Sequence, residues 1–214
     1  WRPTANHSLY ATYSTGYRPA GTRVAPDSVV DPNVLDVRSF FDKEDVTNYE
    51  IGWKGSFADG KVYGELSLFR IDWDDMQVRI SRSVCTPAPG VVVEISDPAC
   101  AGLPFYPDNR VRNAKSARSQ GVEFSLVTKP VDGLMLSGNV GYLDAEFKDF
   151  TDSEIGDVSG RRMPFSPKWS LSGSGRYEWA VKDDMTANLR ADVIYRTSTY
   201  LRLTDLGSSG FPYE

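Results

Sequence analysis

The fold is decided by the stretch N-Y-E-I-G-W-K-G-S-F-A-D-G-K-V-Y-G-E-L-S-L-F-R-I-D-W-D-D-M-Q-V, which runs from Asn48 to Val78. Its first part alternates apolar and polar side chains with a period of two, which indicates a β-strand with two unlike faces. Asp59-Gly60 tolerates positive φ angles, so residues 58–61 are predicted to form a tight hairpin turn before a returning strand. The first strand places Tyr49, Ile51, Trp53 and Phe57 on its apolar face and Glu50 and Lys54 on its polar face.

The apolar face of this hairpin must meet either a protein core or the acyl chains of a membrane. The chain has 214 residues, of which 40% are hydrophobic, so it is long enough for one β-domain. It contains no run of about 18 apolar residues that would form a spanning helix, but the strands of a membrane barrel need only about 10 alternating residues. The rest of the chain has to decide between the two surroundings.

Charge and cysteine content argue against a nucleic-acid partner and against a zinc site. The net charge is -5 and the Lys and Arg residues are scattered singly, so no basic surface for nucleic acid is predicted. Cys85 and Cys100 lie in one Pro-rich segment, and zinc would need more ligands than this pair and the single His7. This composition favours a local disulfide, and hence an oxidising compartment.

The same alternation recurs along the chain and predicts seven antiparallel strands. Long connections over Pro19–Asp45 and Ser81–Arg112, and an acidic one over Asp149–Gly160, alternate with short turns. In the third strand Leu68 and Phe69 are adjacent and both apolar, so a bulge or a change of surroundings is expected there. The predicted strands are Ser8–Arg18, Asn48–Phe57, Val62–Val78, Ala114–Lys129, Leu134–Phe147, Phe165–Trp179 and Ala187–Arg196.

The connections predict a membrane-embedded barrel, because short turns at one end of a sheet and long loops at the other are typical of outer-membrane proteins. A Lys or Arg facing lipid at mid-depth costs about 2–4 kcal/mol, and the apolar face of the most regular strands carries no charge. A soluble barrel with the pattern turned inward remains an alternative, although it would favour short loops at both ends. Aromatic residues gather toward strand ends as in interfacial girdles: Phe57, Tyr177 and Trp179 near short turns, and Tyr17, Tyr49, Tyr142, Trp169 and Tyr195 near long loops.

Several short runs resemble one family, the TonB-dependent outer-membrane receptors. The run L-Y-A-T-Y-S-T-G-Y-R-P, which begins at Leu9, is similar to the family pattern Y-A-S-Y-S-x-G-F-R-P. N-A-K-S-A-R-S-Q-G-V-E at Asn113–Glu123 is similar to N-A-G-x-A-x-S-x-G-V-E, the most specific match of the set. Further resemblances lie at Glu44–Lys54 (E-x-x-x-N-Y-E-I-G-x-K), Phe69–Val78 (F-R-I-D-W-D-D-M-Q-V) and Arg162–Trp169 (R-M-P-F-S-P-K-W).

The resemblance implies an all-β, antiparallel barrel of about 22 strands, closed by an N-terminal plug domain, in the outer membrane of a Gram-negative bacterium. It implies import of a scarce nutrient, above all a ferric siderophore complex, driven by the TonB–ExbB–ExbD complex acting on the plug, without a cofactor or covalent chemistry. Cobalamin, an oligosaccharide or an aromatic compound as the ligand, or a soluble β-barrel binding module, are the alternatives. Residues 1–214 are expected to be one portion of the barrel, with the plug and the final strands outside it, because bacterial barrels have even strand numbers.

The long loops are expected to capture the ligand, because cations and aromatic faces suit ferric chelates and ring-bearing molecules. Packing within the loops is the alternative role for the same side chains. The candidates are Arg23, Phe40, Phe41, Arg82, Phe105, Tyr106 and Arg110.

Charged side chains on the polar face are expected to pair across strands, face water or meet the plug, because a dry unpaired charge is costly. His7 is expected to be a solvated loop residue and supports no catalytic site. Asp72, Asp74 and Asp75 lack the oxygen count of a calcium site, and the acidic connection with Asp149, Asp152, Glu154 and Asp157 is the better candidate for a divalent ion. The charges assigned to the polar face are Glu50, Lys54, Glu123, Arg176, Glu178, Arg190 and Asp192.

Overall fold

A computed structural model of the chain describes residues 1–24, 38–88, 91–94, 96–152 and 156–201. These residues form β-strands and one short 3-10 helix, η2 (Pro98–Cys100). No helix in these ranges has the length and apolar content needed to cross a membrane. The strands are β1 (His7–Arg18), β2 (Gly21–Val24), β3 (Arg38–Phe41), β4 (Glu44–Phe57), β5 (Val62–Ala88), β6 (Val91–Glu94), β7 (Tyr106–Thr128), β8 (Leu134–Asp149), β9 (Thr151–Asp152), β10 (Gly156–Asp157), β11 (Trp169–Lys182) and β12 (Met185–Arg196).

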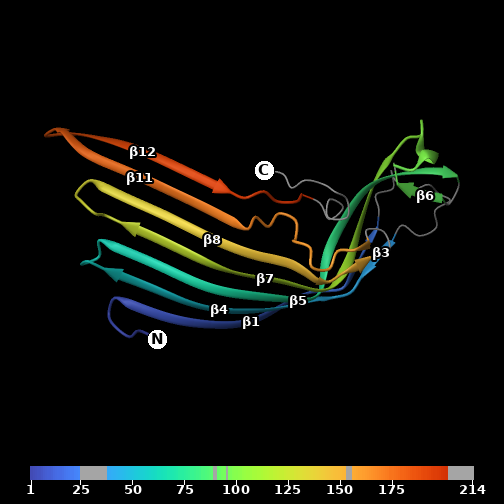
Figure 1. Ribbon diagram of the computed structural model, residues 1–214, viewed down its shortest axis with the longest axis horizontal. Coiled ribbons are helices and arrows are strands. Elements are labelled where there is room, and N and C mark those ends of the chain that lie inside the picture. Colours follow the sequence, from blue (N-terminus) through green and yellow to red (C-terminus); the bar gives the residue numbers. More distant parts are fainter. Residues whose placement is uncertain (25–37, 89–90, 95, 153–155, 202–214) are drawn as a thin grey trace.

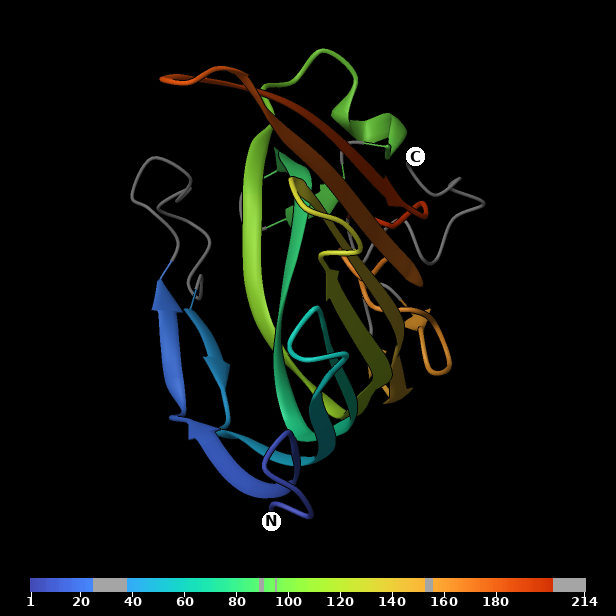
Figure 2. The same cartoon turned by 90° about the vertical axis from the view of Figure 1, so that its left-hand side faces the viewer.

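The long strands form one antiparallel sheet in the order β1-β4-β5-β7-β8-β11-β12, with β6 paired to β5 at one end. Each long strand therefore pairs with the next long strand in the sequence. Figure 1 shows these strands side by side, and Figure 2 shows that the sheet curves as an arc, like part of a cylinder wall. The predicted fold class, a partial antiparallel β-barrel with seven wall strands, is confirmed.

The hairpin predicted from Asn48–Val78 is present as β4 and β5. The two strands pair without interruption from Phe57 and Val62 at the turn to Asp45 and Asp74 at the far end. In the turn, Gly60 has φ 83°, a conformation that glycine adopts without steric cost, and its N–H donates to the Phe57 carbonyl at 3.1 Å. Short turns of this kind join the strands at one end of the sheet, which we call the short-turn end; the other is the long-loop end (Figure 1).

The two long connections contain more strand than predicted. The prediction of a loop over Ser81–Arg112 is wrong at both ends, because β5 continues to Ala88 and β7 begins at Tyr106, and the two pair as far as Val84 and Tyr106. Prolines made this segment look irregular, yet Pro107 lies opposite Ser83 within the ladder. The connection predicted over Pro19–Asp45 likewise contains the paired strands β2 and β3.

The upper parts of β5 and β7, Met76–Ala88 and Tyr106–Ala114, form what we call the extension. It begins where Asp75 adopts a positive φ of 52°, and in Figures 1 and 2 it bends toward the concave side of the sheet. Near its tip, Cys85 and Cys100 form the predicted disulfide, with Cα atoms 5.7 Å apart. The disulfide ties β5 to η2, whose Asp97 side chain caps the helix by accepting from the Ala99 N–H at 2.8 Å.

The buried core lies at the long-loop end, on the concave side, and not along the middle of the sheet. Phe147 and Ile80 are each 1% exposed, and the rings of Phe147 and Phe150 lie 5.4 Å apart. The segment after β8 closes this core from the side, since the Val158 N–H donates to the Phe150 carbonyl at 3.0 Å. We call this group the inner cluster; its members are Val78, Ile80, Ala114, Ala117, Phe147, Phe150 and Val158, with Trp73, Met76, Met163 and Tyr200 packed against it.

Candidate functional site

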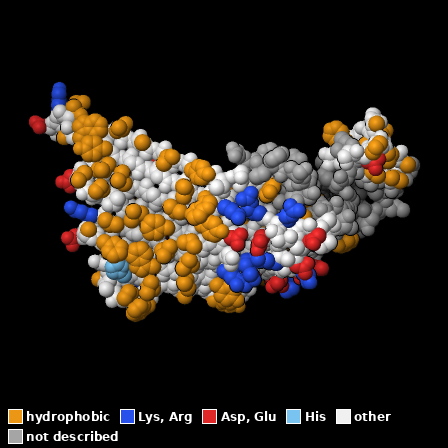
Figure 3. All heavy atoms as spheres, in the orientation of Figure 1, with side chains coloured by type: hydrophobic (Ala, Val, Ile, Leu, Met, Phe, Trp, Pro, Cys, Tyr) orange, Lys and Arg blue, Asp and Glu red, His pale blue; other side chains and the backbone are white. Residues whose placement is uncertain are grey.

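The convex face of the sheet carries a continuous band of exposed apolar side chains beside the short-turn end. Ile51, Leu68 and Val122 are direct cross-strand neighbours in this band, and Leu189 on β12 is 68% exposed. Figure 3 shows the band as the orange area on the left part of the surface. We call this side the outer face and the band the outer band; it contains Leu9, Ile51, Trp53, Phe57, Val62, Leu66, Leu68, Val122, Phe124, Leu126, Val140, Leu171, Leu189 and Val193, and no charged residue.

Aromatic side chains border the outer band at the short-turn end. His7 stacks on Trp53 with ring centroids 5.9 Å apart and meets the edge of Phe57 at 4.8 Å. On β11, Tyr177 and Trp179 stack at 5.6 Å. The expectation that His7 is a solvated loop residue is wrong, because His7 begins β1 and packs among these rings.

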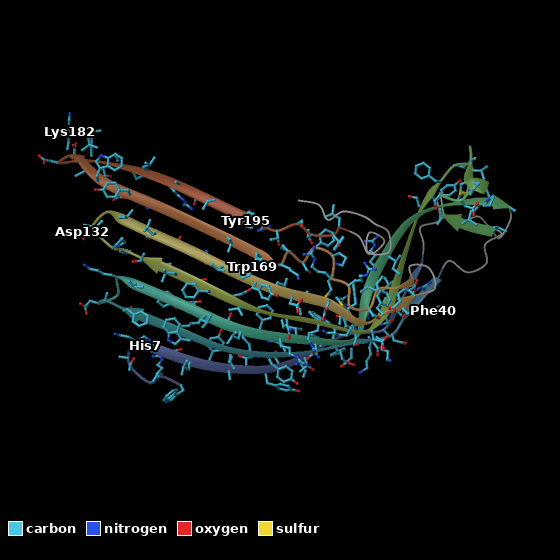
Figure 4. All side chains as sticks on the ribbon, in the orientation of Figure 1. His7, Phe40, Asp132, Trp169, Lys182 and Tyr195 are labelled. Atoms are coloured by element: carbon cyan, nitrogen blue, oxygen red, sulfur yellow. A yellow bond between two sulfur atoms is a disulfide. The ribbon has the colours of Figure 1, made fainter. Side chains whose placement is uncertain are left out.

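A second row of aromatics borders the band on its long-loop side. The rings of Tyr13 and Tyr49 lie 5.4 Å apart, and those of Tyr142 and Trp169 lie 4.9 Å apart. From Trp169 to Trp179 the strand covers about 33 Å, which at a tilt of about 40° gives a height of about 25 Å. This height matches the lipid-facing band of a membrane barrel. Figure 4 marks the two borders: Trp169 and Tyr195 lie on the long-loop side, and His7, Asp132 and Lys182 at the short-turn end.

Beyond the second aromatic row the two faces of the sheet exchange character. On β5, Leu68 points to the outer face, Phe69 to the inner face and Arg70 to the outer face again, in unbroken register with β4 and β7. The adjacent apolar pair therefore reflects a change of surroundings and not a bulge. The Phe69 ring lies over Gly121 on the inner face, where a Cβ on the glycine would come within 2.8 Å of it. We call this level the inversion row.

Below the inversion row the inner, concave face is polar, as predicted. Lys54 and Glu65 pair across β4 and β5 at 3.3 Å, and the Tyr10 hydroxyl donates to Glu50 at 2.5 Å. Two other ion pairs form along a strand and not across strands: Arg176 bonds Glu178, and Arg190 bonds Asp192 at 2.8 Å. These pairs are about half exposed, which suits a wet interior. The inner face also carries Glu123 and a row of small polar side chains, Ser125, Ser137, Asn139, Ser172 and Ser174.

A buried polar cluster joins the first connection to the extension. Gln77 is 9% exposed; its backbone N–H donates to Glu44 at 2.6 Å, and its side-chain nitrogen donates to the carbonyls of Pro19 and Asp42, both at 2.9 Å. Asn113 accepts from the Asp42 N–H at 2.8 Å and donates back to the Asp42 carbonyl at 3.1 Å. These bonds hold residues on both sides of the β2–β3 hairpin against β5 and β7, so the hairpin has a fixed place at the long-loop end.

The hairpin carries two of the residues predicted to bind ligand. Phe40 is 63% exposed on β3, whereas the Phe41 ring packs over Gly21, close enough that a Cβ there would lie 2.7 Å away. Phe40 therefore presents a free aromatic face at the long-loop end (Figure 4), and Phe41 has a packing role. Arg23 lies on β2, but its side chain is outside the described residues.

The other predicted ligand residues lie on the extension. Phe105 is 62% exposed just before β7, and Tyr106 begins β7 opposite Val84. Phe105 and Tyr106 lie far from the β2–β3 hairpin. Asn113 bonds Asp42, the residue after Phe41, and Asn113 is about 23 Å along β7 from Tyr106. The structure thus brings Phe40 and Phe41 together and Phe105 and Tyr106 together, as two pairs. Arg82 and Arg110 lie on β5 and β7 with side chains outside the described residues.

The acidic residues considered for a divalent ion have cationic or hydrogen-bonding partners. Asp149 pairs with Lys115 at 2.6 Å, and Asp152 pairs with Arg112 at 3.3 Å. Asp157 accepts from the Ser159 N–H at 2.9 Å, and hydrogen bonds from Ser159 hold the pKa of this carboxyl below its usual value. Glu154 lies outside the described residues, and within the described ranges no group of three or more His, Cys, Asp or Glu is placed to hold a metal ion.

Sequence reasoning missed the buried polar cluster and the arginines on the outer face. Glu44, Gln77 and Asn113 look like ordinary polar residues in the sequence, because the backbone groups to which they bond belong to distant segments. The signal for the second group was present: Arg70 follows Phe69 directly, and a charged residue that replaces the alternating Leu on one face marks a change of solvent.

The fold resembles solved siderophore receptors over nearly its whole length. The ferric yersiniabactin uptake receptor FyuA from Yersinia pestis has a TM-score of 0.64 and 19% identity, covering 95% of this chain and 26% of the receptor. BauA, the ferric preacinetobactin receptor from Acinetobacter baumannii, has a TM-score of 0.60 and 20% identity, covering 96% and 26%. PiuA, a siderophore receptor from Acinetobacter baumannii, has a TM-score of 0.58 and 22% identity, covering 95% and 26%. The chain thus spans about a quarter of the length of these receptors.

Sequence comparison agrees with the geometry. The family model described as TonB dependent receptor-like, β-barrel, matches residues 1–211, nearly the whole chain. The wall strands, the apolar outer band between two aromatic rows and the separation of short turns from long loops are features of outer-membrane β-barrels. The chain therefore belongs to the TonB-dependent receptor β-barrel family.

Proposed function

We propose that this chain is a portion of the barrel of an outer-membrane receptor that imports a ferric siderophore with energy from the TonB–ExbB–ExbD complex. In this proposal the short-turn end faces the periplasm and the long-loop end faces the outside of a Gram-negative cell. A plug domain, lying outside residues 1–214, closes the barrel and receives the energy. The chain contributes wall and ligand-capturing surface and performs no covalent chemistry.

The observation that carries the proposal is the outer band. Its exposed apolar side chains would aggregate in water, whereas between acyl chains they need no cover. The two aromatic rows lie where the interfaces of a bilayer would be, about 25 Å apart in height. The inner face, with half-exposed ion pairs such as Lys54–Glu65, suits a lumen that contains water and the plug.

The long-loop end supplies the features needed to capture a chelate from outside. Phe40 and Phe105 present exposed aromatic faces at two heights, on segments held by the buried polar cluster and near the disulfide, respectively. Ring-bearing chelates gain from stacking on such faces, and fixed segments reduce the entropy lost on binding. The similarity to FyuA, BauA and PiuA supports a ferric siderophore over other ligands that such receptors could take.

The test uses the full-length gene that encodes this chain and a strain from which that gene has been deleted. Under iron limitation, the deletion strain should lose uptake of one ferric siderophore from a panel of hydroxamate, catecholate and mixed-ligand chelates, measured with radioactive iron. The complemented strain should recover uptake, and a protonophore or loss of TonB should abolish it while leaving surface binding intact.

Each other outcome has a defined meaning. If the deletion strain takes up every chelate normally but loses cobalamin or oligosaccharide uptake, the protein is a transporter whose ligand is not a siderophore. Uptake that persists without TonB would reject energised import. A full-length protein that is monodisperse in water without detergent would reject the membrane placement and support a soluble binding module.

A further inference from the structure

The outer face carries a group of charged side chains directly above the outer band. Arg70 is the next outward residue after Leu68 on β5, and Asp72 and Arg118 are cross-strand partners in the following outward row. Figure 3 shows this charged surface beside the orange band on the same face. The group lies outside the barrel, so it cannot contact a ligand that passes through the lumen.

Two arginines in this group share one carboxylate. Arg70 donates from Nε to Oδ2 of Asp72 at 2.8 Å, and Arg118 donates from Nε to Oδ1 at 2.6 Å. Each guanidinium therefore uses only its inner nitrogen, and the terminal nitrogens have no hydrogen-bond partner in the part of the chain that the structure describes. The trio has a net positive charge, and the carboxylate fixes both arginines in place. We call Arg70 and Arg118 the arginine pair.

Two of the neighbouring acidic groups, Asp144 and Glu146, have donors of their own, and Asp74 lies one outward row beyond Asp72. Asp144 accepts from the Gln120 side chain at 3.4 Å, and Glu146 pairs with Lys148. The arginine pair is therefore not needed to neutralise them. The Arg70 side chain is 48% exposed and the Arg118 side chain 30% exposed, so both are accessible from the outer face.

The arginine pair lies at the level of the lipid headgroups and just beyond it. One outward step along a strand is about 6.6 Å, or about 5 Å in height at the usual tilt. Arg70 thus lies about 5 Å above the edge of the outer band, within the polar layer that extends about 5–7 Å beyond the acyl chains. Arg118 lies about 10 Å above the edge, just beyond that layer, in the same row as Asp72. Tyr49, the direct neighbour of Arg70 on β4, belongs to the aromatic row that marks this interface.

We propose that Arg70 and Arg118, held by Asp72, form a binding site for a phosphate group on the headgroup of an outer-leaflet lipid. Two guanidinium groups with free terminal nitrogens match phosphate oxygens, because the planar fork donates two parallel hydrogen bonds. The lipid is favoured over free phosphate by the outward direction and by the apolar surface directly below, which would hold the acyl chains of the same molecule. The site rests on the proposed membrane placement and is independent of the imported ligand.

The test measures how strongly lipid A, which carries phosphate monoesters, binds to the purified full-length receptor in detergent micelles. Arg70→Gln combined with Arg118→Gln should weaken lipid A binding at least about tenfold, because two charge-assisted contacts are lost. Arg190→Gln is the matched control, since Arg190 bonds Asp192 two residues away just as Arg70 bonds Asp72, but on the inner face. This control should bind lipid A as the unchanged receptor does, and phosphatidylcholine should bind all three proteins alike.

Further variants separate the site from folding and from import. Arg70→Lys with Arg118→Lys keeps the charge but loses the fork, so it should bind with intermediate strength and fold normally. The proposal is overturned if the double Gln variant binds lipid A as strongly as the unchanged receptor does, or if Arg190→Gln weakens lipid A binding as much as the double Gln variant does. It is also overturned if millimolar inorganic phosphate displaces lipid A completely. Siderophore import is expected to survive in the double Gln variant. A receptor that binds lipid A through the arginine pair but imports no siderophore would reject only the proposed ligand.

Discussion

The lower and upper parts of β5 follow opposite rules, although they belong to one uninterrupted strand. From Val62 to Leu68 the apolar side chains point away from the cylinder, whereas Phe69, Ile71 and Trp73 point into it. Beyond Asp75, whose φ is 52°, Val78 and Ile80 are buried in the inner cluster. Between Val62 and Asp74 the strand is paired without interruption on both sides, so across the inversion row the period of two is kept and only the surroundings change. The difference teaches that the outer face meets an apolar solvent below the inversion row and a polar one above it.

The largest effect is expected when one phenylalanine is removed from the inner cluster and, for comparison, one from the outer band. Phe147→Ala, in the inner cluster, should cost about 3–5 kcal/mol of unfolding free energy, because the ring is buried by protein and leaves a cavity. Phe124→Ala, on the outer band, should cost much less, since lipid or detergent fills the space. Urea unfolding of the full-length receptor in micelles, followed by tryptophan fluorescence, measures both. Equal losses would contradict the assignment of the two surroundings.

A second test exchanges charge between the faces of β12. Leu189→Arg should destabilise the folded receptor by about 2–4 kcal/mol, because it places a cation against acyl chains. Arg190→Leu, on the adjacent inward position, should have a much smaller effect. The yield of folded receptor in lipid vesicles, resolved by its heat-dependent electrophoretic mobility, compares the two. A larger loss for Arg190→Leu would reverse the face assignment.

A third test sharpens the comparison at the long-loop end, where polar groups are buried. Gln77→Leu should cost about 1–3 kcal/mol, because the carbonyls of Pro19 and Asp42 lose their donor. The β2–β3 hairpin should then be cut faster by a protease added outside the cell. Gln120→Leu is the control, since its 3.4 Å bond to Asp144 lies on the partly exposed outer face. Unchanged cleavage of the hairpin would show that the cluster does not hold it.

The smallest effect is expected at an ion pair of the lower inner face. Lys54 and Glu65 are 46% and 38% exposed, so their coupling energy should be about 0–1 kcal/mol. A double-mutant cycle with Lys54→Met and Glu65→Gln measures it in the full-length receptor. A coupling of several kcal/mol would indicate that this face is dry, which would contradict a lumen that contains water.

The lower part of the molecule could be predicted from the sequence because lipid and a wet lumen impose a simple alternation. The turn at Gly60, the pairing of Ile51 with its partner on β5 and the disulfide at Cys85 all followed from residue type and spacing. The extension could not be predicted in the same way. Its strands contain prolines and pack against irregular segments, so their pattern depends on contacts that the sequence does not display.

The candidate site could be predicted only as a set of residue types. Phe40 and Phe105 were identified as aromatic loop residues, and both are exposed, but their separation along β7 depends on the length of the extension. Phe41 has the same side chain and the opposite role, since Gly21 allows its ring to pack down. The different roles of Phe40 and Phe41 follow from the register of β2 with β3, which pairs Gly21 with Phe41. This register could not be predicted from the sequence, because the two strands are short and irregular.

The unbroken register of β5 across the inversion row limits how this region can vary in evolution. Adding or deleting a single residue between Gly64 and Asp75 would reverse the orientation of the side chains beyond it. Charged side chains would then face lipid, and apolar side chains would face water. Length changes are therefore tolerable only past the tip of the extension, where the disulfide confines them to a closed segment. A lineage could acquire a new specificity there while its membrane anchorage stays untouched.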